Sequence, residues 1–235
     1  TDIIRKQMYY VGFRQALSPV VDITRDPRWG RITETYGEDA ALTSAMASAF
    51  VKGIQGDELK EGVLATAKHF AGHGITEGGL NMGRNIVSER DMREIHCKPF
   101  QCAIMEAGLS VMNSYCSVNG EPVVGSKKML TDILRGEMGF QGFVVSDYLS
   151  LDRLVDPFAV AENFEEAGIR AIQAGLDVEY PRSKGFSYKM KESIESGRLS
   201  MDIIDQAVRR VLTQKFELGL FENPYPDLEK LKKYL

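Results

Sequence analysis

A carboxylate closes one of the most apolar short segments of the chain, GFQGFVVSDY at residues 139–148. Burying this aspartate, Asp147, would be costly unless it has a polar partner or faces a polar cavity. In a cavity, a carboxylate of this kind suits nucleophilic chemistry. The alternative is a structural carboxylate that caps the helix after the segment. Its position alone does not decide between the two interpretations.

A second polar pair closes another apolar segment, VLATAKHF at residues 63–70. Lys68 and His69 precede a glycine-rich loop at residues 71–85, whose backbone can approach a ligand closely. A lysine near a carboxylate lowers the pKa of the carboxylate and keeps it ionised, which suits a nucleophile. The alternatives are a surface lysine beside a structural histidine, or a lyase or aldolase lysine that forms a Schiff base.

Three residues of this region are spaced as metal ligands could be, namely His69, His73 and Glu77. Gly72 and Gly74 would break the helix needed to align them, and no further ligand stands out. The chain also contains no GxGxxG motif after its first predicted strand and no GxxxxGK[ST] motif. We therefore expect neither a metal nor a nucleotide cofactor.

Arginine and aspartate residues surround the only tryptophan in SPVVDITRDPRWGRITETYGED, residues 18–39. These charged groups could stabilise the loop through ion pairs with one another. Alternatively, a guanidinium that points into a cavity would bind neighbouring sugar hydroxyls through its fork of donors.

Short apolar segments alternate along the chain with stretches of helical periodicity. Strands are predicted at residues 16–23, 63–70, 109–115, 139–148 and 176–180. Helices are predicted at 3–14, 39–55 with Gly56 as its cap, 88–107 with Ser88 as its cap, 127–138, 165–175, 186–196 and 202–217. Such alternation is typical of an α/β fold with a parallel sheet covered by helices.

Polar residues at the carboxyl ends of the predicted strands favour a (β/α)8 TIM-like barrel over an open doubly wound sheet. Asp22, Lys68, Asn113 and Asp147 would converge there on one site. A complete barrel has eight strands in about 250 residues, whereas five strands are predicted here. We expect a single domain over residues 1–235 that is a barrel incomplete at its N-terminal end.

Composition excludes several classes of function. The chain has 235 residues, a net charge of −4 and 43% hydrophobic residues, which is typical of a folded globular domain. No cluster of Lys and Arg suggests binding to nucleic acid or to an anionic membrane, and no apolar run approaches the roughly 20 residues of a membrane span. We expect a soluble protein, cytoplasmic, periplasmic or secreted, with three reduced cysteines and a neutral small substrate.

Five motifs, in this order, resemble the N-terminal barrel of family 3 glycoside hydrolases. They are SPVVDITRDPRWGRITETYGED, ATAKHFAGHG, SERDMRE, SVMNSYCSVNG and GFQGFVVSDY. The later segment VRRVLTQKFELGLFENPY resembles the last helix and exit of that barrel. The resemblance covers nearly the whole chain.

The resemblance implies roles for individual residues. Asp147 matches the catalytic nucleophile of the family, and Tyr148 follows it where the family usually has a tryptophan that stacks on the sugar. The implied sugar-binding residues are Arg31, Lys68, His69, Met112, Tyr115 and Tyr148.

The implied activity is that of a retaining, exo-acting β-glycoside hydrolase. The first expectation is a β-glucosidase that releases terminal non-reducing β-D-glucosyl residues through a covalent glycosyl-aspartate, and the alternative is a β-xylosidase. Most members carry the proton donor on a second domain after the barrel. We therefore expect the acid/base outside this chain, and an isolated chain with little activity. The implied partners are a small carbohydrate and that second domain.

Two other readings remain open. A single-domain β-N-acetylglucosaminidase-like enzyme would take its acid/base from the loop after ATAKHF, where only Glu77 with His73 could serve. A non-catalytic carbohydrate-binding barrel is the alternative from another class.

Overall fold

A parallel four-stranded sheet lies at the centre of the structure, a computed structural model that describes residues 1–106 and 110–232. Its strands occur in the order β1 (Gln15–Ala16), β2 (Leu64–Phe70), β4 (Ser110–Asn113) and β7 (Phe143–Val145). Val178 extends the sheet beyond β7 through a parallel bridge to Val145. The parallel order confirms the predicted α/β class.

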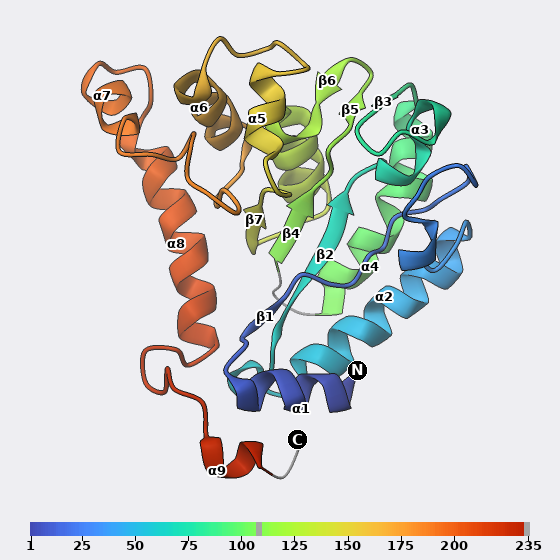
Figure 1. Cartoon of the computed structure of the whole chain (residues 1–235), viewed down its shortest axis with the longest axis vertical. Helices are drawn as coiled ribbons and strands as arrows, with labels where there is room; N and C mark the ends of the chain where they lie inside the picture. Colours follow the sequence, from blue (N-terminus) through green and yellow to red (C-terminus); the bar gives the residue numbers. More distant parts are fainter. Residues whose placement is uncertain (107–109, 233–235) are drawn as a thin grey trace.

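Helices pack around this sheet (Figure 1). The α-helices are α1 (Asp2–Val11), α2 (Ala40–Gln55), α3 (Glu89–Asp91), α4 (Lys98–Glu106), α5 (Ser150–Val155), α6 (Phe164–Ala174), α7 (Met190–Glu195), α8 (Met201–Glu217) and α9 (Leu228–Leu231). Two helices with wider, π-type turns are η5 (Met92–His96) and η7 (Lys128–Glu137). Among the described residues, α2 and α4 pack against each other and against β2.

Short elements form the loops between these helices and strands. The 3-10 turns are η1 (Ile32–Glu34), η2 (Leu59–Glu61), η3 (His73–Ile75), η4 (Glu77–Gly79) and η6 (Val123–Gly125). A small second sheet contains β3 (Arg84–Asn85), β5 (Ser117–Val118) and β6 (Glu121–Pro122).

Local capping explains where several helices begin and end. The carboxylate of Asp39 accepts a hydrogen bond from the backbone N–H of Leu42 at 2.6 Å, and Gly56 ends α2 with a φ of 69°. The hydroxyl of Ser88 accepts from the backbone N–H of Asp91 at 3.0 Å and starts α3. Both predicted caps are therefore confirmed.

The core fills the space between the sheet and its helices. Strand β2 is buried along nearly its whole length, and its small residues Ala65 and Ala67 are fully covered. Phe70 packs edge-on against Phe100 of α4, with ring centroids 5.1 Å apart. A strand buried on both faces is typical of a parallel sheet covered by helices.

Several predicted elements are shorter than their apolar segments. The strand predicted at 16–23 is regular only in β1 and then pairs irregularly with β2, because Pro19 has no N–H to donate. The strand predicted at 176–180 is reduced to the bridge at Val178. The predicted helix end at Ala107 and strand start at Leu109 lie outside the described residues.

The sheet is open in the part of the chain that the structure describes, with β1 at one edge and Val178 at the other. This arrangement agrees with the expectation of an incomplete barrel. Among the described helices, none has the length and apolarity needed to cross a bilayer.

Candidate active site

Asp147 lies just beyond the carboxyl end of β7. Its Oδ1 accepts a hydrogen bond from the backbone N–H of Tyr148 at 2.7 Å, and its own backbone N–H donates to Asn113 Oδ1 at 3.3 Å. The residue is only 8% exposed, yet Oδ2 has no hydrogen-bond partner among the described residues. A buried carboxylate oxygen left free in this way is available to react or to bind a ligand.

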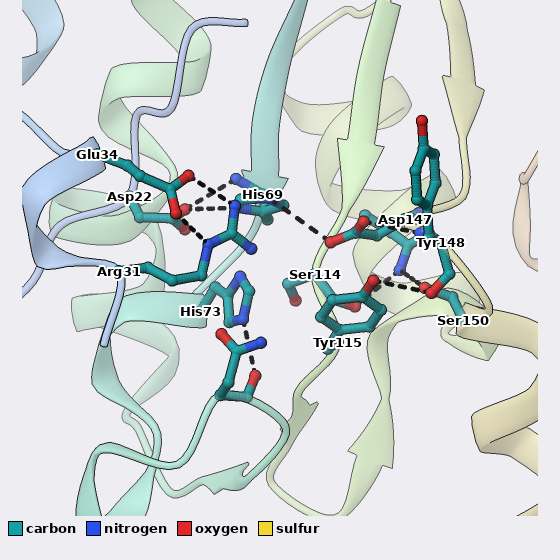
Figure 2. A network of polar contacts seen from close by, with 12 residues as sticks. Asp22, Arg31, Glu34, His69, His73, Ser114, Tyr115, Asp147, Tyr148 and Ser150 are labelled. Atoms are coloured by element: carbon teal, nitrogen blue, oxygen red, sulfur yellow. Dashed lines mark hydrogen bonds and ion pairs between the residues drawn. The ribbon is translucent and has the colours of Figure 1, made fainter. Parts of the chain in front are cut away.

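His69 reaches Asp147 from the end of β2. Its Nε2 lies 3.6 Å from Asp147 Oδ2, across the end of the intervening strand β4 (Figure 2). On its other side, the Nδ1 of His69 lies 2.8 Å from Asp22 Oδ2, and the backbone N–H of His69 donates to the same oxygen at 3.1 Å. The peptide bond between Lys68 and His69 is cis.

His73 stands behind His69 in the loop after β2. The two rings meet edge to face with centroids 4.6 Å apart, and the ring of Trp29 lies 5.1 Å from that of His73. His73 Nε2 is 2.8 Å from the carbonyl oxygen of Asn81, and Trp29 Nε1 donates to Asn81 Oδ1 at 3.1 Å. The tryptophan of the RWGR motif therefore helps to hold the loop after β2 in place.

Arg31 lies on the same side of the site as Asp22 (Figure 2). Its guanidinium forms two hydrogen bonds to the Glu34 carboxylate, at 2.7 and 2.8 Å. The hydrogen bonds with Glu34 raise the pKa of Arg31, and the charges of Asp147 and Asp22 add to this effect. The sequence left two arrangements open for this loop, ion pairs within it or a guanidinium that faces a cavity. Arg31 forms an ion pair with Glu34 and also lies beside the site.

Lys68 has a lowered pKa, because burial and then the positive charge of Arg31 disfavour its ammonium form. The negative charges of Asp147, Glu34 and Asp22 oppose that shift. Three carboxylates and two cations therefore influence one another within the site.

Burial sets the protonation of the buried groups. It lowers the pKa of His69 to about 3 and that of His73 to about 4, so both rings are neutral near pH 7. It raises the pKa of Asp22 to about 6, although the backbone hydrogen bond from His69 acts in the opposite direction.

Two tyrosines lie on the far side of Asp147. The Tyr115 hydroxyl donates to the carbonyl oxygen of Tyr148 at 2.8 Å, and the Tyr148 ring is about half exposed. The ring of Tyr180 lies edge-on to Tyr148, with centroids 6.5 Å apart. Burial, followed by the charge of Asp147, raises the pKa of Tyr115 and keeps it protonated as a donor.

Most, but not all, of the residues predicted for the site lie around Asp147. Arg31, Lys68, His69, Tyr115 and Tyr148 gather around Asp147 through the contacts and charges described above. Met112 lies in β4 and is 1% exposed within the hydrophobic core.

Glu77 and His73, the alternative acid/base pair, form no hydrogen bond or ion pair with each other in the structure. Glu77 accepts a hydrogen bond from Arg84 at 2.7 Å in an exposed ion pair, whereas His73 is fully buried and bonded to Asn81.

The family motifs implied no role for Asp22 or Glu34. Asp22 was nevertheless expected at the site, because it is one of the polar residues at the ends of the predicted strands. Glu34 lies three residues after Arg31, a spacing at which side chains on one helical turn meet.

Asp22, His69 and His73 are also the group of described residues whose donor atoms come close enough to share a cation, all within 4.8 Å of one another. The spacing in the sequence had suggested Glu77 as the third possible ligand, whereas this group contains Asp22 instead. His69 Nδ1 is already bonded to Asp22, and His73 Nε2 to the Asn81 carbonyl. A cation would have to displace at least one of these hydrogen bonds.

The fold and site together define an α/β protein of barrel type whose acidic, basic and aromatic side chains meet at the carboxyl ends of parallel strands. Residues 1–214 match the glycosyl hydrolase family 3 N terminal domain. The chain belongs to this family, as the five motifs indicated.

Similar proteins agree with this assignment. A putative beta-xylosidase from Formosa agariphila is 39% identical over 99% of this chain and 31% of its own length. A periplasmic beta-glucosidase from Salmonella typhimurium is 35% identical over 92% of this chain and 28% of its own. A mutant beta-glucosidase from Listeria innocua in complex with laminaribiose superposes with a TM-score of 0.94 and 35% identity, over 100% of this chain and 33% of the other. The chain thus spans about a third of the length of such relatives.

Proposed function

We propose that the chain is the sugar-binding, nucleophile-carrying domain of a retaining, exo-acting β-glycoside hydrolase. The first candidate for its activity is a β-glucosidase. The observation that carries this proposal is the carboxylate of Asp147, which is buried and faces His69. Among the described residues, one of its oxygens has no hydrogen-bond partner. A nucleophile needs a free oxygen in a site that excludes water but admits the anomeric carbon.

In the proposed reaction, Asp147 Oδ2 attacks the anomeric carbon of the terminal sugar. The bond from that carbon to the leaving oxygen breaks, and its electron pair passes to the leaving oxygen, which a second carboxylic acid protonates. Water then attacks the same carbon while the second carboxylate takes a proton from that water. The bond from the carbon to Asp147 Oδ2 breaks, and its electron pair returns to the Asp147 carboxylate. Arg31, Lys68 and His69 would bind sugar hydroxyls, while Tyr148 would cover an apolar face of the ring.

The second carboxyl group of a retaining glycosidase lies about 5–5.5 Å from the nucleophile. We assign it to a part of the whole enzyme outside this chain, as the family resemblance implies. The activity, substrates and partner domain of the whole protein are therefore part of this proposal.

A β-xylosidase is the second candidate. A putative beta-xylosidase and a beta-xylosidase, both from Formosa agariphila, are 39% and 40% identical to the chain, compared with 35% for the Salmonella typhimurium beta-glucosidase. The two sugars differ at C5, where glucose carries a hydroxymethyl group. Contacts to that group would decide between them.

A glycosyl fluoride tests the role of Asp147 independently of the second carboxylic acid, which we assign to another part of the enzyme. Fluoride leaves without protonation, so 2-deoxy-2-fluoro-β-D-glucosyl fluoride can trap the nucleophile when no acid is present. We expect the intact mass of the 235-residue chain to rise by one fluoroglucosyl unit, with the label on the peptide that contains Asp147. A label on another residue would overturn the assignment.

The corresponding fluoroxyloside tests the second candidate in the same assay. Faster labelling by the fluoroxyloside would favour the β-xylosidase. Absence of labelling by either sugar, in a chain shown to be folded by circular dichroism, would favour a non-catalytic carbohydrate-binding domain.

A further inference from the structure

Asp22 holds His69 through two hydrogen bonds to a single oxygen. Asp22 Oδ2 accepts from the backbone N–H of His69 at 3.1 Å and lies 2.8 Å from its ring Nδ1. Asp22 is 2% exposed and His69 is 1% exposed, so water does not compete for these bonds. An ionised carboxylate has no hydrogen to donate, so the proton of the shorter bond must belong to Nδ1 of the histidine.

This hydrogen bond determines what the other ring nitrogen can do. Burial keeps His69 neutral, because it lowers the pKa of the ring to about 3. A neutral ring with its proton on Nδ1 presents a lone pair at Nε2. That nitrogen lies 3.6 Å from Asp147 Oδ2, so two hydrogen-bond acceptors face each other. Neither of them supplies a hydrogen to the other.

His73 fixes the orientation of the same ring from its other side. Its ring meets that of His69 edge to face at 4.6 Å, and its Nε2 is bonded to the Asn81 carbonyl. Because a carbonyl oxygen is only an acceptor, Nε2 of His73 carries a proton. His69 is therefore held by a hydrogen bond on one edge and by packing against His73 (Figure 2).

We propose that Asp22 is a positioning residue that holds His69 in the tautomer with its proton on Nδ1, so that Nε2 accepts a hydrogen bond from a sugar hydroxyl beside Asp147. The sugar rests on the proposed function, whereas the tautomer is a property of the chain without any ligand. The ligand must bring a hydrogen-bond donor to this point, as a sugar hydroxyl does.

The tautomer is measured directly by long-range ¹H–¹⁵N NMR of the histidine rings in the ¹⁵N-labelled 235-residue chain at pH 7. The chain has three histidines, so His73→Gln and His96→Gln variants assign the signals. We expect a protonated Nδ1 and an unprotonated Nε2 for His69. A protonated Nε2, or a charged ring, would overturn the proposal whether or not the chain binds sugar.

Substitution of Asp22 separates its acceptor oxygen from its charge. Asp22→Asn keeps a carbonyl oxygen that can accept from Nδ1–H, so His69 should stay in the same tautomer. Asp22→Ala removes the acceptor, and the ring should change to the other tautomer or to a mixture. Asp26→Asn, in the same loop and bonded to Arg28, is the matched control and should leave the spectrum of His69 unchanged.

Labelling by the fluoroglucosyl fluoride measures the consequence for the site. We expect Asp22→Ala to slow trapping by about 10²-fold, the cost of misplacing a group in a reactive site, while Asp22→Asn retains most of the rate. Equal rates in all three chains would show that Asp22 has no positioning role. If Asp22→Ala does not fold, the wild-type spectrum and Asp22→Asn still decide the question. If no chain is labelled, the proposed function fails and the tautomer result stands alone.

Discussion

His69 Nε2 lies 3.6 Å from Asp147 Oδ2, although the two residues end strands that are not neighbours in the sheet. Strand β4 lies between β2 and β7, and Asn113 at its end donates to neither carboxylate oxygen but accepts the backbone N–H of Asp147. Three successive strand ends therefore define the relative positions of the nucleophile candidate and the histidine. A site built on strand ends is held more rigidly than one built on loops.

The first prediction concerns Asp147. Asp147→Asn preserves the size of the side chain and removes its negative charge, so the amide should not attack the anomeric carbon. We expect covalent trapping by the fluoroglucosyl fluoride to fall by at least about 10³-fold, on the scale of losing a covalent nucleophile. Intact-protein mass spectrometry over time gives the rate.

Asp132→Asn provides the matched control, because Asp132 pairs with Lys127 on an exposed surface away from the site. It should be labelled as fast as the wild-type chain. Undiminished labelling of Asp147→Asn would contradict the assignment of the nucleophile.

The second prediction concerns pH and the three histidines. Burial is the main cause of the low pKa of His69, about 3, and of His73 and His96, about 4 each. In the unfolded chain these rings bind protons below about pH 6.5. Protons therefore bind preferentially to the unfolded state as the pH falls from 7 to 4, so the free energy of unfolding decreases over this range.

Asp22 acts in the opposite direction. Its pKa is raised to about 6, so the folded state takes up a proton as the pH falls through 6, which offsets part of the loss. We expect a net decrease in the free energy of unfolding on the order of 2–4 kcal/mol between pH 7 and pH 5. Urea denaturation at the two values measures it. Equal or higher stability at pH 5 would show that the histidines are not held neutral.

Much of the architecture could be predicted from the sequence because it depends on local patterns. Continuous apolar segments indicated the buried parallel strands, and Ser88 and Gly56 were correctly expected to cap their helices. Strand lengths could not be predicted, because hydrogen-bond pairing depends on neighbouring strands. The segment at residues 176–180 alternates apolar and acidic residues, as a strand can, but only Val178 forms a bridge.

The candidate site was predictable to the extent that its residues end strands. Asp147, Lys68 and His69 follow apolar segments, and that position indicated a common site. The partner of His69 could not be predicted, since the hydrogen bond from His69 to Asp22 depends on how an irregular segment runs beside β2. Met112 is buried in the hydrophobic core, and its expected place in the pocket lining stays a prediction.

The third prediction concerns close packing beneath the site. A Cβ added at Gly74 would lie 2.5 Å from the carbonyl oxygen of Ile23, next to Asp22. The Ile23 oxygen belongs to the backbone, so one of the two segments would have to move. We expect Gly74→Ala to destabilise the chain by about 1–3 kcal/mol and to slow trapping of Asp147.

Gly30→Ala provides a matched control next to Arg31. A Cβ at Gly30 meets nothing within 4 Å among the described residues. Its effect on the free energy of unfolding should stay within about 0.5 kcal/mol. Indistinguishable urea curves for the two variants would show that the loop yields easily at Gly74.

The fourth prediction concerns a buried ion network that joins the sheet to two helices. Asp177 Oδ2 accepts hydrogen bonds from Arg135 of η7 at 2.6 Å and from the backbone N–H of Val144 at 2.7 Å. Its Oδ1 accepts from Arg210 of α8 at 2.8 Å. One carboxylate thus connects β7, η7 and α8.

Asp177→Ala would leave Arg135, whose side chain is 11% exposed, without its counterion, and would free the N–H of Val144. Removing one member of a buried charge network costs about 3–5 kcal/mol, because the remaining charge is buried without compensation. We expect a loss of this size in urea denaturation at pH 7. Asp26→Ala breaks an ion pair with Arg28, whose side chain is largely exposed, and should cost no more than about 1 kcal/mol. Equal losses in the two variants would mean that water solvates Arg135 once Asp177 is gone.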